Sequence, residues 1–188
     1  MSAKREIRET AHAGGMVHTL VHLHHVITYG CDGLRRLTGK GKMKRRERVV
    51  GYHLVHGILI SLGQVREALN ILVELESSLR DAFAPFEEDL VRWTLFRDDA
   101  AHLIDRTHRV SLPGQHDARI GEDEYGYDTD LLPYDYGSDT VRTGADNTMV
   151  LKPEVDKVYE ILSVAFERTV VGYREGTVKP PPRYREKN

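Results

Sequence analysis

The chain has 188 residues, a length that fits one domain, alone or with an appended arm, better than two full domains. Its 27 Lys and Arg residues and 29 Asp and Glu residues leave a formal net charge of -2. The overall charge therefore does not indicate binding to nucleic acid or to a membrane, and any such signal must be local. The single cysteine, Cys31, excludes an intramolecular disulfide and a zinc site built from thiolates.

The sequence also lacks the signals of secretion and membrane insertion. Residues 1–15 are charged and contain no apolar run of the kind found in a secretory signal. No later stretch reaches the roughly 20 apolar residues that a membrane-spanning helix needs. Together with the lone cysteine, these features predict a soluble, cytoplasmic protein without a membrane partner.

The first predicted helix covers residues 5–29. From residue 16 onward its side chains separate into two faces at the helical period of about 100° per residue. The apolar face contains Met16, Leu20, Leu23 and Ile27, and the opposite face contains His18, His22, His25 and Tyr29. We expect the apolar face to pack into a core. Residues 30–42 are rich in glycine and are expected to form a loop.

Two further helices are predicted on either side of Gly63. Residues 43–62 are apolar on nearly all sides after Val49, as in a central bundle helix, and Gly63 is expected to end this helix. A third helix is predicted over residues 65–83, where apolar side chains recur at helical spacing.

A fourth helix is predicted to begin at Pro85 and to end near Arg109. The consecutive acidic residues 87–89 suit the positive end of its dipole. Residues 114–140 have no helical period and are rich in acidic, tyrosine and glycine residues, so we interpret them as an acidic arm.

The C-terminal part begins with a β-hairpin predicted over residues 140–152. A last helix starts at Pro153, and the basic, proline-rich residues 173–188 are expected to be disordered. The sequence therefore predicts an all-α fold: a bundle of four to five helices with a small β-hairpin and an acidic arm, in a single domain over residues 1–172.

The fourth helix contains the most informative residue. Apolar residues recur along one of its faces, and Arg97 stands where this pattern calls for a hydrophobic side chain. A guanidinium does not lose its proton, so a buried Arg needs a carboxylate, carbonyl oxygens, solvent or an anionic ligand. His102 follows Asp98 by one turn, so the Asp98 carboxylate is placed to orient its imidazole.

The segment from Arg97 to His102 reads Arg-Asp-Asp-Ala-Ala-His. It resembles the motif of the HEPN superfamily, in which a polar residue follows an Arg and a His stands five positions after it. Members of that superfamily are helical-bundle proteins found in toxin and defence systems. Many toxin members have a Tyr two residues after the His, and this chain has Ile104 there, which argues against control by nucleotide transfer to that position.

The resemblance implies a metal-independent endoribonuclease without a cofactor, acting as a homodimer with its RNA cleft at the dimer interface. Arg97 would hold the scissile phosphate and His102 would move the proton of the attacking 2′-hydroxyl or of the leaving 5′-oxygen. Asp98 would orient these groups. The resemblance also implies an antitoxin or inhibitor protein as a partner.

Residues 35–48 form a basic cluster, with eight Lys and Arg residues against the single acid Glu47. Clusters of this kind bind phosphates with an affinity that depends on salt. The predicted RNA-binding residues are Lys44, Arg45, Arg46 and Arg48. A charge run more often forms a solvated surface, so this second interpretation stays open.

Five histidines on the first two predicted helices are an alternative candidate site: His18, His22, His25, His53 and His56. Spacings of three and four residues place imidazoles on one side of a helix, where they can bind Zn, Fe or Cu. None has an acidic residue three positions before it, as the Glu-x-x-His pairs of di-iron bundles require. We therefore predict no metal, and expect the first three on a solvated face or subunit contact and the last two in the interior.

Three functions remain open from the sequence. The first is RNA cleavage through Arg97 and His102. The second is a non-catalytic helical interaction module in which Arg97 is structural, and the third is a histidine-rich metal-binding bundle.

Overall fold

The computed structural model describes residues 3–39, 43–109, 134–143 and 148–169. Within these ranges, the side chains of residues 3–11, Arg45 and residues 102–109 are not described. Most of the acidic arm and the predicted tail over residues 173–188 lie outside the described residues.

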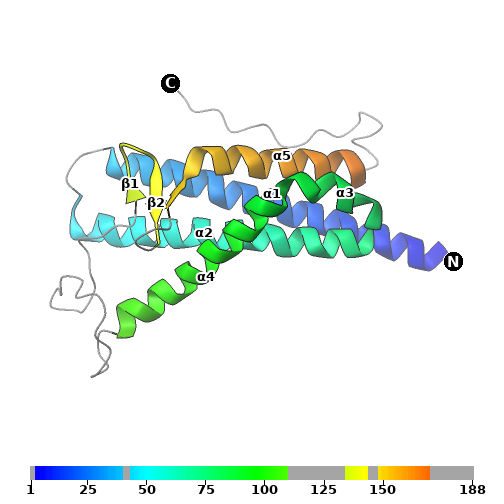
Figure 1. The fold of residues 1–188 in the computed structure, drawn as a ribbon, viewed down its shortest axis with the longest axis horizontal. Helices are drawn as coiled ribbons and strands as arrows, with labels where there is room; N and C mark the ends of the chain where they lie inside the picture. The colour runs from blue at the N-terminus through cyan, green and yellow to red at the C-terminus, as the bar shows by residue number, and fades with distance from the viewer. Residues whose placement is uncertain (1–2, 40–42, 110–133, 144–147, 170–188) are drawn as a thin grey trace.

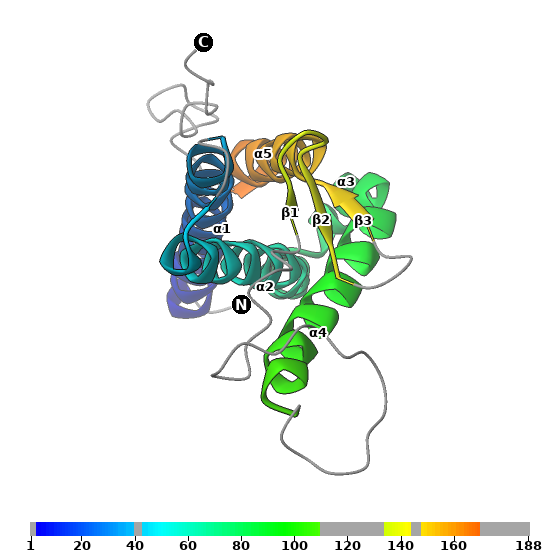
Figure 2. The same cartoon turned by 90° about the vertical axis from the view of Figure 1, so that its left-hand side faces the viewer.

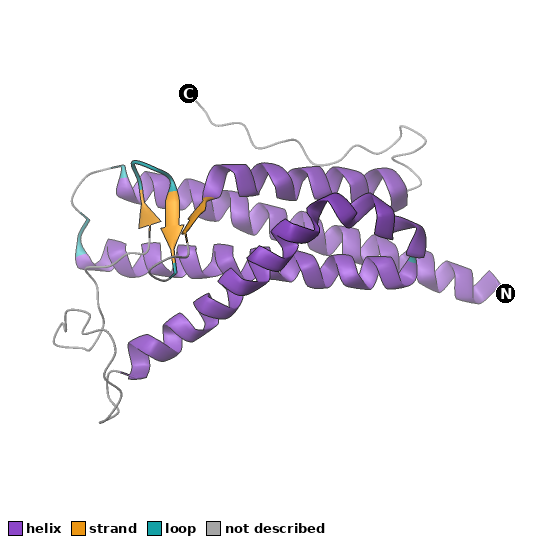
Figure 3. Ribbon diagram, viewed as in Figure 1, coloured by secondary structure: helices purple, strands orange, loops and turns teal. Residues whose placement is uncertain are grey.

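Four long helices form a bundle in the described part of the chain (Figures 1 and 3). They are α1 (Ala3–Thr38), α2 (Arg45–Leu75), α4 (Glu87–Arg109) and α5 (Leu151–Thr169). The one-turn helix α3 (Arg80–Phe83) lies between the 3-10 turns Ser77–Leu79 and Ala84–Phe86. The all-α bundle predicted from the sequence is therefore confirmed. Among the described residues, no helix is both long enough and apolar enough to cross a bilayer.

The helices differ in direction. α1, α2 and α5 run lengthwise beside one another, whereas α4 crosses α2 at an angle (Figure 1). The view along the bundle shows α1 packed against both α2 and α5, with α4 on the far side of α2 from α1 (Figure 2). The C-terminal half of α4 is splayed away from the bundle in both views.

The core forms where the apolar faces of these helices meet. Leu20, Leu23 and Ile27 of α1 are at most 4% exposed, which confirms the predicted apolar face. The opposite, exposed face of α1 contains His18, His22, His25 and Tyr29. Periodicity alone therefore predicted the orientation of α1 correctly.

Two predicted helix ends are wrong. α1 does not stop near Tyr29 but continues to Thr38, so the expected loop over residues 30–42 is helical as far as that residue. α2 does not stop at Gly63 but continues to Leu75, so the helices predicted over residues 43–62 and 65–83 are largely one.

The physical reason is that these glycines lie at contacts between helices. A Cβ at Gly30 would lie 2.7 Å from Cγ1 of Ile58, and a Cβ at Gly63 would lie 2.5 Å from Cδ of Arg97. Glycine in a helix interior costs about 0.5–1 kcal/mol relative to alanine, and the helix tolerates this. Here the missing side chains let α1 approach α2 and let α2 approach α4, so the glycines mark close packing.

A small antiparallel sheet lies at one end of the bundle (Figure 1). Its strands are β1 (Tyr134–Asp135), β2 (Thr140–Arg142) and β3 (Thr148–Val150), in the order β1-β2-β3. The pairing of β2 with β3 confirms the predicted hairpin, and Val141 lies opposite Met149 in its register. β1 is an addition, because the sequence placed these residues in the arm.

The two remaining helix starts agree with the sequence to within two residues. α4 begins at Glu87, just after the 3-10 turn that contains Pro85, and has three acidic residues in its first turn. α5 begins at Leu151, directly after β3 and two positions before the predicted Pro153.

Candidate functional site

Arg97 lies on α4 where this helix packs against α2. Trp93 and Ala100, on the core-facing side of α4, are fully buried, whereas the side chain of Arg97 is 26% exposed. Its aliphatic stem lies against Gly63 of α2, which has no side chain to occupy that space. A solvent-accessible cation therefore interrupts the buried stripe of α4.

Two carboxylates hold the Arg97 guanidinium. Its Nε and Nη2 donate hydrogen bonds to Oδ1 of Asp98 at 3.1 and 3.0 Å. Its Nη1 donates a hydrogen bond to Oε1 of Glu67 on α2. The hydrogen bond to Asp98, followed by the bond to Glu67, raises the pKa of Arg97 above its usual value. Asp98 and Glu67 are 54% and 60% exposed, so this group of charges lies at the surface.

These bonds do not use all the hydrogen-bonding capacity of Arg97. A guanidinium presents five N–H donors, and three of its donor contacts go to Asp98 and Glu67. Within the described part of the chain, the remaining two donors have no protein partner. As far as the described residues go, these two donors are left for an anion.

His102 belongs to the same helix as Arg97, but its side chain is not among those that the structure describes. A separation of five residues places the two backbone positions about 140° apart around an ideal helix. The core-facing side of α4 contains Trp93 and Ala100, so the backbone position of His102 lies on the outer side. The carboxylate of Asp98, predicted to orient His102, is bonded to Arg97.

The outer side of α4 exposes apolar side chains. Val91 is 40% exposed and Leu95 is 59% exposed. Together with Asp98 and the backbone position of His102, they follow spacings of four, three and four residues, which place them on one helix face. One stripe of α4 thus combines exposed apolar groups with two of the three predicted catalytic positions.

The predicted RNA-binding residues lie at the start of α2, away from Arg97. Lys44 and Arg46 are exposed, Arg48 is partly buried, and the side chain of Arg45 is not described. At a rise of 1.5 Å per residue, Arg46 lies about 25 Å along α2 from the point where Arg97 contacts this helix. One copy of the chain does not bring these cations next to Arg97.

Another part of the basic cluster contacts the end of the acidic arm. Nη2 of Arg35 on α1 lies 2.7 Å from Oδ2 of Asp139, and Oη of Tyr134 donates a hydrogen bond to Oδ1 of the same carboxylate at 2.7 Å. Asp139 adopts a φ of 52° in the turn between β1 and β2.

Burial raises the pKa of the nearby Cys31 to about 12, so its thiol stays protonated at neutral pH and is a poor nucleophile.

The structure does not gather the five histidines of the alternative metal site. The three on α1 are exposed, and the two on α2 lie at a different level along the bundle. Within the described residues, no group of three or more His, Cys, Asp or Glu side chains is arranged to hold a metal ion. His53 is exposed, so its expected interior position is wrong. His56 is partly buried, and burial together with His53 lowers its pKa.

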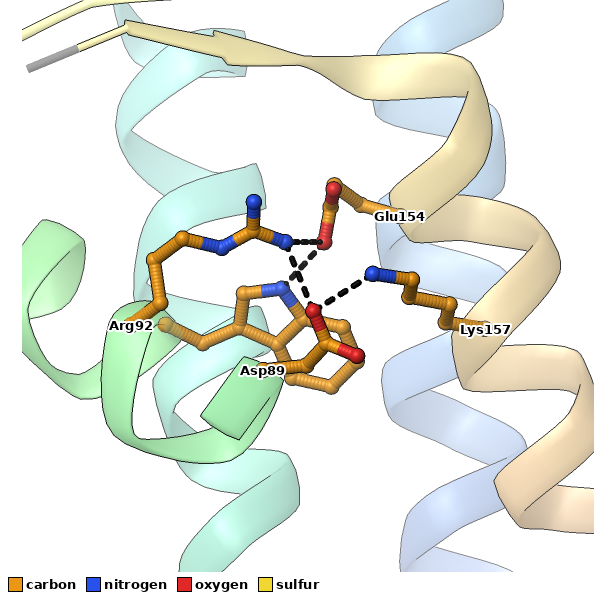
Figure 4. Close-up of polar contacts among 5 residues, drawn as sticks. Asp89, Arg92, Glu154 and Lys157 are labelled. Atoms are coloured by element: carbon orange, nitrogen blue, oxygen red, sulfur yellow. Dashed lines mark hydrogen bonds and ion pairs between the residues drawn. The ribbon is translucent and has the colours of Figure 1, made fainter. Parts of the chain in front are cut away.

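A cluster of charged side chains around the buried Glu154, between α4 and α5, was not predicted from the sequence (Figure 4). Oε2 of Glu154 accepts hydrogen bonds from Nη2 of Arg92 and Nε1 of Trp93, each at 2.6 Å. Oδ1 of Asp89 accepts hydrogen bonds from Arg92 at 2.9 Å and from Lys157 at 2.5 Å. The only sequence signal is the three-residue spacing between acid and base on each helix. Because Glu154 of α5 is 4% exposed and its Oε2 accepts two hydrogen bonds from α4, this cluster fastens α4 to α5.

A buried histidine was also missed. His24 on α1 is 2% exposed and lies beside Tyr159 of α5, with ring centroids 5.8 Å apart. Its Nδ1 has no hydrogen-bond partner among the described residues. Burial, and then the neighbouring His25, lowers its pKa from 6.5 to about 4. His24 falls beside the apolar face in the helical pattern, which is the signal that could have revealed it.

Comparison of the chain with protein-family models, curated proteins and solved structures gives no match. The functional interpretation therefore depends on the residues themselves.

Proposed function

We propose that this protein is a metal-independent endoribonuclease of the HEPN type that cleaves RNA between two copies of the chain. The observation that supports this most directly is the state of Arg97. It stands in the core-facing stripe of α4, is 26% exposed, and has two N–H donors without a protein partner among the described residues. A fixed cation with free donors is what a phosphate oxyanion requires.

The proposed reaction uses the 2′-hydroxyl of the RNA as the nucleophile. The 2′-oxygen attacks phosphorus and the bond from phosphorus to the 5′-oxygen breaks, which leaves a 2′,3′-cyclic phosphate and a 5′-hydroxyl. Arg97 binds the phosphate oxygens and stabilises the negative charge that develops on them. His102 takes the 2′-hydroxyl proton or supplies a proton to the leaving 5′-oxygen, because an imidazole titrates near neutral pH.

The geometry of α4 supports the homodimer in this proposal. Within one chain, Arg97 and His102 are about 140° apart around the helix, so a shared phosphate is reached more easily by Arg97 of one copy and His102 of another. The exposed side chains of Val91 and Leu95 lie on the same stripe as the His102 position and give this side of α4 an apolar surface, which favours contact with a second copy.

In this proposal the basic cluster binds the RNA backbone at a place distant from the bond that is cleaved. Lys44 and Arg46 are exposed and contact the RNA backbone without regard to sequence, with an affinity that falls as salt rises. A cytoplasmic ribonuclease of this kind acts as a toxin or defence effector and is kept in check by an antitoxin or another inhibitor protein.

A second candidate function is a non-catalytic interaction module. The two carboxylates on Arg97 favour it, because a cation already paired with Asp98 and Glu67 also serves to fasten α4 to α2. In this alternative, the exposed stripe of α4 binds a protein partner and Arg97 is structural.

Cleavage of labelled RNA in the presence of a chelator distinguishes the two. We expect the wild type to cleave, and Arg97→Ala and His102→Ala each to slow cleavage by at least about 100-fold. The exposed residues Arg80 and His12 provide matched controls, and Arg80→Ala and His12→Ala should cleave as the wild type does. Cleavage that survives His102→Ala, or intact RNA with the wild type, would rule out the nuclease. A loss of more than about 2 kcal/mol in unfolding free energy for Arg97→Ala would favour the interaction module.

A further inference from the structure

Arg97 is held by a residue that the sequence motif does not contain. Glu67 belongs to α2, thirty residues before Arg97, and accepts a hydrogen bond from Nη1 of its guanidinium. Gly63 lies one turn earlier on α2 and contacts the stem of the same side chain. The two α2 residues together set where the cation of the candidate site stands.

The charges around the guanidinium do not favour an anion. One cation faces two carboxylates, Asp98 and Glu67, so the immediate surroundings have a net charge of -1. A phosphate that approaches the two Arg97 donors without a partner among the described residues is attracted by the guanidinium and repelled by both acids. The affinity of the site for a phosphate therefore depends on whether a carboxylate remains in place.

Of the two carboxylates, Glu67 is the one that is able to move away from the Arg97 guanidinium. Its side chain is 60% exposed, and among the described residues Arg97 is its only polar partner. Asp98, by contrast, is next to Arg97 in the chain and is bonded to two of its nitrogens. Moving Glu67 into water breaks a single surface ion pair and requires no change in the helices.

We propose that Glu67 gates the Arg97 site: its carboxylate occupies the guanidinium in the free protein and gives way when an RNA phosphate binds. The identity of the anion as RNA rests on the function proposed above. The competition between Glu67 and a phosphate rests on the contacts of Arg97 alone.

Binding of a non-cleavable RNA tests the gate. A fluorescent 2′-O-methyl oligonucleotide has no nucleophilic hydroxyl, so its anisotropy reports affinity without cleavage. We expect Glu67→Gln, which removes the charge but keeps an acceptor oxygen, to tighten binding about tenfold at low salt. The matched control is Glu74→Gln, an exposed acid seven residues further along α2, for which we expect a change below about twofold.

A double-mutant cycle tests whether the tighter RNA binding of Glu67→Gln depends on Arg97. In the Arg97→Ala background, Glu67→Gln should no longer tighten binding. Equal affinity of Glu67→Gln and wild type, an equal gain in Glu74→Gln, or a gain that persists without Arg97 would each overturn the gate.

Cleavage kinetics provide a readout that a purely structural role of Glu67 would not change. In the proposed gate, the Glu67 carboxylate moves away from Arg97 when RNA binds, before the chemical step. Glu67→Gln should therefore lower KM and change kcat by less than about twofold. If the wild type does not cleave RNA but the binding cycle shows coupling, the nuclease proposal fails and the gate stands. If cleavage depends on Arg97 and His102 but coupling is absent, the gate alone fails.

Discussion

The stem of Arg97 on α4 occupies the space that a side chain at Gly63 on α2 would fill. A Cβ at Gly63 would lie 2.6 Å from Cβ of Arg97 and 2.5 Å from its Cδ. Because Cβ of Arg97 is attached directly to the backbone of α4, the clash is not relieved by rotating a flexible side-chain end. The absence of a side chain at Gly63 therefore sets the distance between α2 and α4 at the candidate site.

Replacing this glycine should destabilise the protein even though alanine favours a helix. Gly63→Ala gains about 0.5–1 kcal/mol from helix propensity and loses about 1–3 kcal/mol to overpacking, so we expect a net loss of up to about 2.5 kcal/mol in urea unfolding. A Cβ at Gly57 on the same helix would meet no heavy atom within 4 Å apart from its chain neighbours and the backbone of its own helix, so Gly57→Ala should be stabilising. Stabilisation by both substitutions would contradict the packing role of Gly63.

The buried carboxylate of Glu154 makes a second prediction. Glu154→Gln removes the buried charge that accepts from Arg92 and Trp93, while Arg92 keeps its bond to Asp89, and we expect a loss of about 1–3 kcal/mol in unfolding free energy. Trp93, the single tryptophan, donates its indole N–H to Glu154, so its fluorescence should also shift. Glu160→Gln, on the exposed face of α5, should change stability by less than about 0.5 kcal/mol. A Glu154→Gln protein as stable as this control would show that the cluster is dispensable.

The buried imidazole of His24 predicts a dependence of stability on pH. Its pKa is lowered from 6.5 to about 4 in the folded protein, so below pH 6.5 the unfolded chain binds a proton that the folded chain does not. The stabilising effect of the neutral imidazole is fully present above pH 6.5 and is lost as pH falls towards 4, by up to about 3 kcal/mol.

The substitution His24→Leu isolates this contribution from that of the carboxylates. We expect the unfolding free energy of the wild type to fall more steeply than that of His24→Leu between pH 6.5 and 4. Identical slopes in urea titrations, or an NMR titration of His24 near its ordinary pKa, would contradict the prediction.

The parts of the fold that follow local rules were predictable from the sequence. The two faces of α1 follow from a helical period that continues over many residues, and the start of α4 follows from Pro85 and the acids after it. The hairpin β2–β3 was found because both strands are short β-forming segments joined by turn residues.

The parts that depend on contacts between helices were not predictable. Gly30 and Gly63 look like helix ends in a sequence, and only the approach of Ile58 and Arg97 shows why each lies inside a helix. β1 was missed because two residues are too few to show an alternating pattern. Glu67 and Glu154 look like ordinary surface acids until their partners, thirty or more residues away, are known.

Mixing two inactive variants tests the central claim, that one copy supplies Arg97 and the other supplies His102. In a mixed dimer of Arg97→Ala and His102→Ala, one of the two sites has lost both residues and the other has both intact. Co-expression of the two variants should therefore restore RNA cleavage in chelator to about a quarter of the wild-type rate, since about half of randomly formed dimers are mixed and each has one working site. Wild-type cleavage without any restoration in the mixture would contradict a site shared between subunits, and the absence of wild-type cleavage would contradict the nuclease itself.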